Sequence, residues 1–440
     1  METIRLTKPI PWQAPGGPKG VLVEMAPDRV RLELARGSER LSGRVEVAVM
    51  LPEHDEKFCL VGDVMNTLDS QVQDLVVEGA DGHLFDLMGQ VRKVQHIEIC
   101  AHQNVEASDI YTGFSELSFV PEALPEFNFS NLDTSIEFLG RRFNAPILIT
   151  GMTGGIERGA EINNRLALAA QEFGIPMGVG SQRVALENKA YCDIFDVKKT
   201  APDIFLIGNI GGAQLLQGNP VDLCRQAVEM VGADALAIHL NVLQECLQVE
   251  GDRDFSGMLE AIGEVAADLG VPVMVKEVGC GISPATAAKL WQVGVHAIDV
   301  GGKGGTSWGY IEGLRSSSEE TKELAQLFRD WGVPTAYTLA ALKKAGAPGE
   351  LVATGGIRDG LMIAKAVALG AKACGVGLPL MRAALKGEDE PKLVLKSLLR
   401  GLQVTMMASG ASDLNQLSSK LCWGRPQASD FREYVNGFQS

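Results

Sequence analysis

The sequence lacks closely spaced cysteine pairs and any excess of positive charge. Its eight cysteines are spread along the chain, and none forms a CxxC pair. Zinc sites and disulfide frameworks are usually built from such pairs, so we expect reduced and mostly buried thiols. The formal net charge of −15 argues against nucleic acid or an anionic membrane as the general partner.

Long apolar runs are missing as well. No run reaches the roughly 18 residues that a membrane-spanning helix needs, and the N-terminus lacks a basic-then-apolar signal pattern. The hydrophobic content of 46% and charged content of 22% are those of an ordinary globular protein. We therefore expect a soluble, cytoplasmic protein whose 440 residues form one large domain and a smaller one.

Residues 1–20 are rich in proline and glycine and are expected to be an irregular lead, and a periodicity of two follows from about residue 21 to residue 90. Apolar residues alternate with charged or small residues over 29–34 and 44–49, and Asp81-Gly82 between two such runs is typical of a hairpin. This pattern predicts a small β-rich module over 1–90, ahead of a second domain over 91–440. The module has no cluster of catalytic residue types, so we interpret it as a packing or oligomerisation unit.

A different pattern begins after residue 91. A helical stretch is expected from Arg92 to about Asn104, and eight short apolar runs then alternate with helical segments. The runs are Pro146–Thr150, Pro176–Gly180, Phe205–Ile210, Ala235–Leu240, Val271–Val278, Ala297–Gly302, Leu351–Gly356 and Ala373–Leu378. Eight strand-then-helix units predict an α/β fold of the (β/α)8 TIM barrel type, with a doubly wound open sheet as the alternative. The connection between Trp308 and Pro334 is expected to be a long loop, and loops of this length can act as lids.

Polar residues gather where the fourth strand is expected to end. His239 and Asn241 leave that strand on one face, and Gln244 and Glu245 follow directly. Catalytic residues of TIM barrels lie at the C-terminal ends of strands, so these four form the first candidate site. They offer a possible cation, two amides and a carboxylate, which can hold an anion beside a divalent metal.

The other strand ends point to a phosphorylated ligand. Glycine-rich turns end the seventh strand at Gly355-Gly356 and the eighth at Gly375–Gly377, and such turns before helices form phosphate cradles. Lys276 would be a buried cation, which an anionic reduced flavin could pair, although a neighbouring carboxylate is the structural alternative. Arg183 supplies positive charge on the second strand.

The chain from about Arg92 to Leu385 resembles the type 2, flavin-dependent isopentenyl-diphosphate isomerases. The motifs that carry the resemblance are Arg92-Lys93-x-x-His96, Met152-Thr153-Gly154-Gly155, Ser181-Gln182-Arg183, Gly208-Asn209-Ile210-Gly211, His239-x-Asn241-x-x-Gln244-Glu245, Val275-Lys276-Glu277-Val278-Gly279, Gly301-Gly302-Lys303-Gly304-Gly305-Thr306 and Gly355-Gly356-Ile357-Arg358. They cover about two thirds of the chain in the order expected of the family. The β-rich module before Arg92 and the tail after about Met406 depart from the family pattern.

The resemblance implies a TIM barrel that binds FMN and Mg²⁺, uses NADPH as reductant and interconverts isopentenyl and dimethylallyl diphosphates. It implies a homo-oligomer, a tetramer or an octamer. The implied FMN contacts are Met152, Thr153, Gly154, Ser181, Asn209, Lys276, Thr306, Gly355, Gly356, Ile357, Gly377 and Leu378. The implied substrate contacts are Arg92, Lys93, His96, Ser181, Gln182, Arg183, Asn241 and Gln244. Gln244 and His239 are the implied catalytic residues, and Glu245 is the implied metal ligand.

Three alternatives remain open at this point. One is an FMN-dependent 2-hydroxyacid oxidase or dehydrogenase, which needs a histidine base beside the flavin and an arginine pair for the carboxylate. Another is a flavin enzyme acting on a different isoprenoid diphosphate, with a site altered by the extra module or the tail. The third is a flavin-bearing scaffold whose β-rich module recruits a partner.

Overall fold

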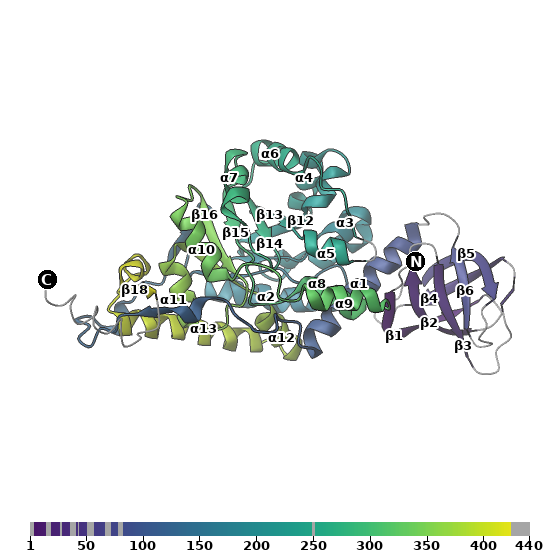
Figure 1. The fold of residues 1–440 in the computed structure, drawn as a ribbon, viewed down its shortest axis with the longest axis horizontal. Coiled ribbons are helices and arrows are strands. Elements are labelled where there is room, and N and C mark those ends of the chain that lie inside the picture. The colour runs from purple at the N-terminus through teal and green to yellow at the C-terminus, as the bar shows by residue number, and fades with distance from the viewer. Residues whose placement is uncertain are drawn as a thin grey trace.

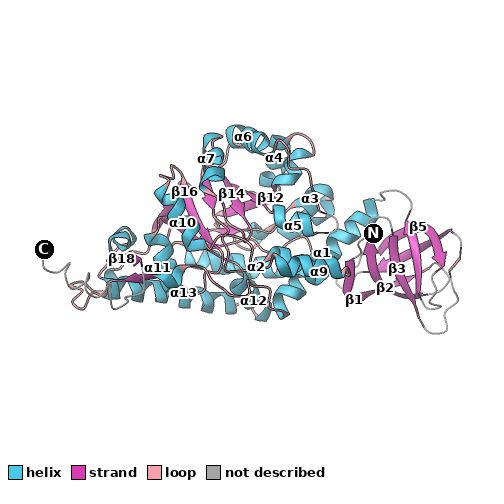
Figure 2. Ribbon diagram, viewed as in Figure 1, coloured by secondary structure: helices cyan, strands magenta, loops and turns pink. Residues whose placement is uncertain are grey.

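The computed structural model describes residues 4–14, 19–26, 29–35, 41–42, 44–50, 57–66, 72–77, 82–248 and 251–423. These residues form a small β unit that lies beside a larger α/β unit (Figures 1 and 2). Residues 424–440, which make up about half of the divergent tail, lie outside the described part of the chain.

The small unit is a closed antiparallel barrel. Its strands are β1 (Ile4–Gln13), β2 (Lys19–Ala26), β3 (Arg29–Leu34), β4 (Arg44–Met50), β5 (Lys57–Asn66) and β6 (Val72–Val77), in the order β1-β2-β3-β6-β5-β4. The barrel closes where β1 pairs with β4, for example Trp12 with Val49. The expectation of an irregular lead over 1–20 is therefore wrong for β1, whose prolines are accommodated in a strand that pairs with β2 and β4. The alternation of the sequence is explained by this closure, because one side chain in two, such as Val30 and Leu32, points into a common core.

Helix α1 (Gly82–His102) connects the two units and begins ten residues earlier than the sequence indicated. Gly82 is helical, so the hairpin expected at Asp81-Gly82 is not formed, and Asp81 itself lies outside the described residues. The helix contacts β1 and β5, and its Val91 belongs to the core of the small barrel. One face of α1 therefore completes the small barrel, while the residues that follow Val91 turn toward the large unit.

The large unit is the expected (β/α)8 barrel, with all eight strands where the apolar runs placed them. They are β10 (Ile147–Ile149), β11 (Met177–Gly178), β12 (Leu206–Gly211), β13 (Ala235–Leu240), β14 (Val273–Glu277), β15 (Ala297–Asp299), β16 (Glu350–Thr354) and β17 (Ala371–Val376). They pair in parallel in this order, and β17 pairs with β10 to close the ring. Continuous apolar runs suit such strands because both faces of each strand are covered.

Twelve further helices flank the barrel strands or cover the end of the barrel within the described residues. They are α2 (Glu157–Phe173), α3 (Arg183–Glu187), α4 (Pro220–Val231), α5 (Val242–Leu247), α6 (Met258–Asp268), α7 (Pro284–Gln292), α8 (Trp308–Arg315), α9 (Glu319–Leu327), α10 (Thr335–Lys344), α11 (Gly360–Ala368), α12 (Leu378–Lys386) and α13 (Glu390–Ser409). Short 3-10 helices lie at Phe114–Glu116, Phe129–Asn131, Lys189–Phe195, Val197–Lys199, Gly212–Leu216 and Leu414–Lys420.

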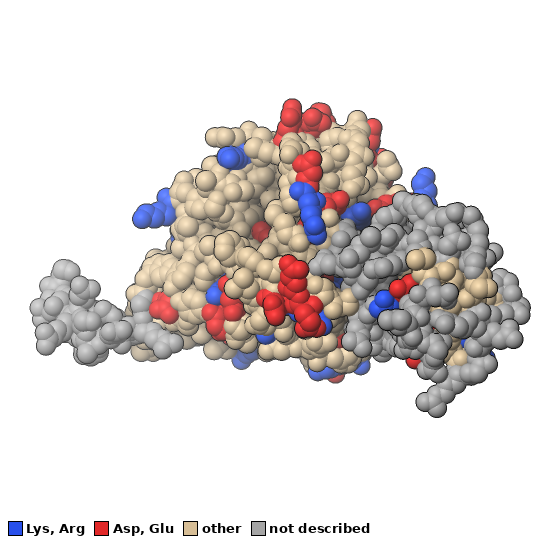
Figure 3. All heavy atoms as spheres, turned by 45° about the vertical axis from the view of Figure 1, so that its right-hand side comes forward, with Lys and Arg blue, Asp and Glu red and all other residues tan. Residues whose placement is uncertain are grey.

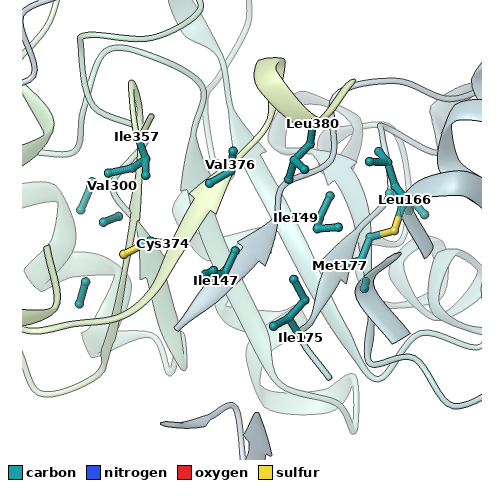
Figure 4. Packing of buried hydrophobic residues seen from close by; sticks show 14 of the residues in the cluster. Ile147, Ile149, Leu166, Ile175, Met177, Val300, Ile357, Cys374, Val376 and Leu380 are labelled. Carbon is teal, nitrogen blue, oxygen red and sulfur yellow. The ribbon is translucent and has the colours of Figure 1, made fainter. Parts of the chain in front are cut away.

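The barrel has two layers of core. The layer between strands and helices is visible in Figure 4, where Ile147 and Ile149 of β10 lie near Met177, Val376 and Leu380. The inner layer fills the barrel and includes Phe138 and Phe143 of a hairpin formed by β8 (Ile136–Phe138) and β9 (Arg141–Phe143). The backbone N–H of Leu139 in this hairpin donates to Glu350, the first residue of β16, so the hairpin covers the N-terminal end of the barrel.

The long connection after β15 is not the loop that the sequence suggested. It contains α8 and α9, and Ser318 caps the start of α9 by accepting a hydrogen bond from the backbone N–H of Thr321 at 3.2 Å. A serine run is common both in loops and at helix N-caps, which explains the wrong expectation. Glu312 and Arg315 of α8 are fully buried and ion-paired, so this segment is a packed part of the barrel rather than a lid.

The end of the described chain returns to the start of the large unit. β18 (Leu421–Trp423) pairs antiparallel with β7 (Leu117–Phe119), and the Trp423 ring stacks on Tyr337. In the view of Figure 3, acidic and basic side chains are scattered over the described surface instead of forming one basic face. None of the helices within the described ranges combines the length and the apolar character needed to cross a membrane.

Candidate functional site

Two adjoining hollows lie over the C-terminal ends of the barrel strands. The basic hollow has a volume of about 660 Å³ and is lined by Arg92, Lys93, His96, Gly151, Met152, Ser181, Arg183, Asn209, Gln214, His239, Asn241, Gln244, Glu245, Gln248, Lys276, Val278 and Trp308. The glycine-lined hollow has a volume of about 550 Å³ and is lined by Thr150, Gly151, Met152, Lys276, Glu277, Val278, Gly279, Gly301, Gly305, Thr306, Trp308, Thr354, Gly355, Gly356, Arg358, Gly375, Gly377 and Leu378. Lys276, Val278 and Trp308 line both, so the two hollows form one continuous site.

A larger hollow of about 1260 Å³ lies among residues that precede the barrel strands, such as Pro272 and His296. None of the site residues expected from the sequence lines it. Catalytic residues of this fold lie at the opposite end of the strands, so we place the functional site in the two adjoining hollows.

A hydrogen-bonded network around Glu312 joins three helices at the basic hollow. The Glu312 Oε1 atom accepts hydrogen bonds from His96 Nε2 of α1 at 3.0 Å and from Gln244 Nε2 of α5 at 2.8 Å. Arg315 pairs with the second oxygen of Glu312 and also donates to Gln95 Oε1 at 3.1 Å. Although burial raises the pKa of Glu312, the positive charge of Arg315 and the hydrogen bonds from His96 and Gln244 hold it well below its usual range. The carboxylate is therefore ionised and fixes the directions of His96 and Gln244.

Gln244 is held at both ends of its amide. Its Nε2 donates to Glu312, and its Oε1 accepts from Asn241 Nδ2 at 3.3 Å. His96, which shares Glu312 with it, is neutral because burial lowers its pKa to about 4. The amide and the imidazole therefore keep one orientation each beside the indole of Trp308, whose ring centroid lies 5.3 Å from that of His96.

His239 is a neutral hydrogen-bonding group rather than the cation that the sequence suggested. Burial lowers its pKa well below the usual value, and Lys276 and Lys93 lower it further. Its Nδ1 lies 2.9 Å from Asn209 Oδ1, while the Asn209 amide donates to Val179 O at 2.9 Å. Because the Asn209 oxygen can only accept, Nδ1 carries the proton and Nε2 is left as an acceptor.

Positive charge in the basic hollow comes from Arg92, Lys93 and Arg183. Burial lowers the pKa of Lys93 to about 7, and the neighbouring Arg92 and Arg183 act in the same direction. Arg183 is anchored by Glu187 at 2.7 Å and lies 3.4 Å from Asp252. Three basic side chains near one another attract an anion, and a diphosphate is an anion of suitable charge.

Glu245 lies at the edge of these cations. Its Oε1 accepts from Asn241 Nδ2 at 2.8 Å and its Oε2 accepts from the backbone N–H of Asp252 at 2.9 Å. Within the described residues, no group of three or more histidine, cysteine or acidic side chains forms a ready metal site. A single oriented carboxylate nevertheless fits Mg²⁺, which commonly binds through one or two carboxylates together with substrate phosphates.

Lys276 lies where the two hollows meet and is buried. Burial lowers its pKa, while Asp299 of the adjacent strand and then Glu277 oppose that shift. In the parallel pairing of β14 with β15, Asp299 is the backbone neighbour of Lys276. The Asp299 carboxylate accepts a hydrogen bond from Thr354 Oγ1 at 2.8 Å. Asp299 is thus a carboxylate close enough to act on Lys276 through its charge, as the structural alternative suggested, and Lys276 also faces both hollows and can meet an anionic group there.

The glycines of the second hollow hold two turns against each other. A Cβ at Gly355 would lie 2.0 Å from Gly302 O, and a Cβ at Gly356, whose φ is +77°, would lie 2.3 Å from Gly304 O. The sequence suggested that these glycines give a phosphate access to the backbone, and the structure adds that they let the turns after β15 and β16 interlock. Helix α12 begins at Leu378 on the same hollow, where its N-terminus favours an anion.

Most residues expected from the sequence line one of the two hollows, and four do not. Ile357 is fully buried in the outer core, while Thr153 and Gly154 lie behind the lining residues, with Gly154 close to Phe195. Gln182 is fully buried, with its amide donating to Ala227 O at 2.8 Å and accepting from the backbone N–H of Asn209 at 2.7 Å. Its polar atoms therefore support the Asn209 strand end instead of facing a ligand.

The structure brings residues into the site that the sequence did not identify. They include Gln214, Gln248, Trp308, Glu312, Asp299 and Thr354. Trp308 and Glu312 belong to the segment expected to be a loop, so a helical reading of that segment was the signal that could have found them. Asp299 lies within an apolar strand, where a single buried carboxylate is itself a functional signal.

The chain is similar to proteins of known family. A model of the FMN-dependent dehydrogenase family matches residues 90–193 and 234–424. An isopentenyl-diphosphate delta-isomerase from Nostoc sp. is 42% identical over 328 residues, which cover 74% of this chain and 94% of that relative. A protein of the same name from Synechococcus sp. is 45% identical, covering 73% of this chain and 92% of the relative. A third, from Thermococcus onnurineus, is 44% identical, with coverages of 74% and 89%.

Solved structures support the fold. A mandelate oxidase variant with a monooxide FMN adduct superimposes with a TM-score of 0.53 and 21% identity, covering 74% of this chain and 95% of that chain. A mandelate oxidase with (S)-2-phenylpropionate gives a TM-score of 0.53 and 20% identity, with coverages of 75% and 94%. At this identity the likeness concerns the barrel architecture alone.

Proposed function

Because the chain belongs to the isopentenyl-diphosphate delta-isomerases within the FMN-dependent dehydrogenase family, we propose that it interconverts isopentenyl and dimethylallyl diphosphates by a 1,3-allylic proton transfer. The observation that carries this proposal is the junction of the two hollows at Lys276, Val278 and Trp308. It would put a diphosphate ester in the basic hollow directly beside a flavin in the glycine-lined hollow.

The basic hollow suits the diphosphate end of the substrate. Arg92, Lys93 and Arg183 can pair with phosphate oxygens, and Asn241 orients Glu245 beside them. Glu245 is the residue that would hold Mg²⁺ against the same phosphates. Neutral His239 cannot add a further positive charge, so its proposed role is to contact the substrate through hydrogen bonding rather than as a cation.

The glycine-lined hollow suits FMN. We propose that the turns at Gly355 and Gly356 and the N-terminus of α12 hold the phosphate, while Lys276 and Thr306 face the ring. Bound reduced FMN would supply an acid–base group at the ring, with NADPH as the reductant of the flavin. The positive charge of Lys276 would favour the anionic form of the reduced ring.

The substrate double bond would lie between the diphosphate site and Lys276, beside Gln244. The reaction adds a proton to one carbon and removes another proton two carbons away, so no electrons are gained or lost overall. Gln244 can orient the reacting carbons and their protons because its amide is fixed by Glu312 and Asn241. The neutral His96 and the Trp308 ring would help to exclude water from the same point.

The direct test is an anaerobic assay with the purified protein. We expect a yellow protein that, after reduction by NADPH and in the presence of Mg²⁺, converts isopentenyl diphosphate to the dimethylallyl isomer. The exchange of deuterium from solvent into the product is expected, because protons enter and leave at carbon. A preparation that neither contains nor takes up FMN would contradict the proposal, and so would an FMN-loaded protein that fails to isomerise.

The 2-hydroxyacid oxidase alternative is not favoured. The similarity to mandelate oxidase is limited to the fold, whereas the relatives at 42–45% identity are isopentenyl-diphosphate delta-isomerases. Lack of flavin reduction by lactate or mandelate under anaerobic conditions would complete the exclusion.

The remaining expectations stay proposals. We propose a cytoplasmic homo-oligomer, and we propose that the six-stranded barrel is an accessory domain, with the division near residue 90 and α1 shared between the two units. The family model begins its match at residue 90, which supports this division. Sedimentation of the full chain at several concentrations would measure the oligomeric state.

A further inference from the structure

Glu277 makes an unusual set of contacts at the end of β14. Its Oε2 atom accepts hydrogen bonds from the backbone N–H groups of Val278 at 2.7 Å, Gly279 at 2.6 Å and Gly281 at 3.3 Å, and also from that of Cys280. Four consecutive amides thus converge on one carboxylate oxygen. Lys276, the preceding residue, lies on the opposite side of the strand.

The loop from 278 to 281 depends on this carboxylate for its shape. Gly279 and Gly281 have φ angles of +152° and +87°, a conformation that turns successive N–H groups toward one point. Such a concave set of amides binds an anion, and without the Glu277 carboxylate the N–H groups of Val278, Gly279 and Cys280 would lose this acceptor. The loop is further tied to its surroundings by hydrogen bonds from Gly281 N to Gly301 O at 3.0 Å and from Val333 N to Cys280 O at 2.9 Å.

The same loop forms a wall of the active site. Val278 lines both the basic hollow and the glycine-lined hollow, and Gly279 and Glu277 line the second. Glu277, Gly279 and Cys280 also border a small space that includes Gln244 and Trp308. A movement of this loop would therefore change the contact between flavin and substrate at the proposed reacting carbons.

We propose that Glu277 is a positioning residue for the isomerase reaction: its carboxylate holds the Val278–Gly281 wall between the two hollows and places a negative charge at the edge of the flavin site. This inference rests on the proposed function, since it assigns a task within the same site. Glu277 touches the reaction only through the loop and through its charge.

The test compares Glu277→Ala and Glu277→Gln in the full-length, FMN-loaded protein, with Glu260→Gln on the exposed side of α6 as the matched control. Burial raises the pKa of Glu277 to about 7, so measurements at pH 8 keep the carboxylate ionised. The readouts are the FMN dissociation constant, the midpoint potential of the bound flavin, and kcat and KM measured separately.

For Glu277→Ala we expect FMN to bind at least ~10-fold more weakly and kcat to fall, because charge-assisted hydrogen bonds are lost. For Glu277→Gln the loop keeps one acceptor oxygen, so FMN affinity should stay within ~3-fold of the wild type. Its midpoint potential should nevertheless become more positive, because a negative charge near the flavin has been removed. Glu260→Gln should change none of these quantities.

Wild-type values of potential, kcat and KM in Glu277→Gln would overturn the proposal, even where Glu277→Ala fails to fold. A lower melting temperature in both variants with unchanged potential and kinetics would also overturn it, because the role would then be structural only. These outcomes are separate from failure of the proposed function, which would appear in the wild-type protein as absence of FMN or of isomerase activity.

Discussion

At the scale of single residues, Glu312 organises the reactive side of the site. Its two carboxylate oxygens bring together His96, Gln244 and Arg315, which come from three helices. A buried carboxylate is stable here because it is ion-paired and fully hydrogen-bonded. The residue is important to the proposed reaction because it fixes the amide of Gln244.

Replacing Glu312 with Gln should reduce both stability and turnover. The Glu312 and Arg315 side chains are 0% and 3% exposed, and breaking a buried pair of this kind costs about 3–5 kcal/mol. Misplacement of Gln244 should lower kcat about 100-fold. Urea unfolding and anaerobic kinetics would measure the two effects, with the exposed Glu320→Gln of α9 as the control. A stable variant with unchanged kcat would show that Gln244 does not need this partner.

The basic hollow should bind substrate less well at alkaline pH. Lys93 is protonated below its pKa of about 7 and loses its charge as pH rises through that value. The ratio of kcat/KM between wild type and Lys93→Met should therefore be large below pH 7 and should shrink above it. Loss of a charged contact to phosphate corresponds to about a 10- to 100-fold effect. A ratio that stays constant from pH 6 to 9 would be inconsistent with a lysine that titrates in this range.

At the scale of elements, the glycine turns after β15 and β16 are the most sensitive part of the flavin site. Gly356→Ala should strongly weaken FMN binding, because the new Cβ would meet Gly304 O at 2.3 Å. The matched control is Gly346→Ala, since Gly346 has nearly the same φ, +75° against +77°, and open space around its Cβ position. FMN affinity measured by fluorescence quenching should fall only in the first variant. An equal loss of FMN affinity in both variants would contradict the clash with Gly304 as the cause and would favour backbone strain instead.

The elements also show where sequence patterns were sufficient. The strands β10 to β17 were predicted because each is buried on both faces and therefore apolar along its length. Helix α8 was missed because its apolar face is short and is interrupted by Glu312 and Arg315, which are buried as a pair. The start of α1 was missed because its first turns precede Val91, which packs into the small barrel rather than the large one.

At the scale of the whole molecule, the small barrel contacts the two helices that carry much of the substrate site. Strand β1 contacts α1 and α8, and β5 contacts α1, so the small barrel braces the wall that holds Arg92, His96 and Glu312 (Figure 1). The direct bonds between α1 and α8 through His96–Glu312 and Gln95–Arg315 do not involve the small barrel. The site should therefore survive without it at a cost in stability.

Deleting residues 1–80 should keep FMN affinity and kcat within ~3-fold of the full chain while lowering the melting temperature. Exposure of Val91 alone corresponds to a loss of roughly 1.5–3 kcal/mol. Differential scanning calorimetry and anaerobic kinetics on both proteins would test this. Because the exposed Val91 should also lower solubility, Val91→Thr in the shortened chain is expected to restore solubility without altering kcat. A shortened protein that is folded but inactive would make the small barrel part of the catalytic machinery.

The sequence by itself determined the eight-stranded barrel, the β-rich start and most lining residues, because strand burial and strand-end chemistry are local and leave a repeating pattern. Only the tertiary structure decided the protonation of His239, the carboxylate whose charge acts on Lys276 and the buried hydrogen bonds of Gln182, because each depends on residues distant in the chain. Glu312 lies 68 residues from Gln244 and 216 from His96. No local pattern can encode a hydrogen bond of that separation, and the closure of the barrel is what brings these side chains within reach.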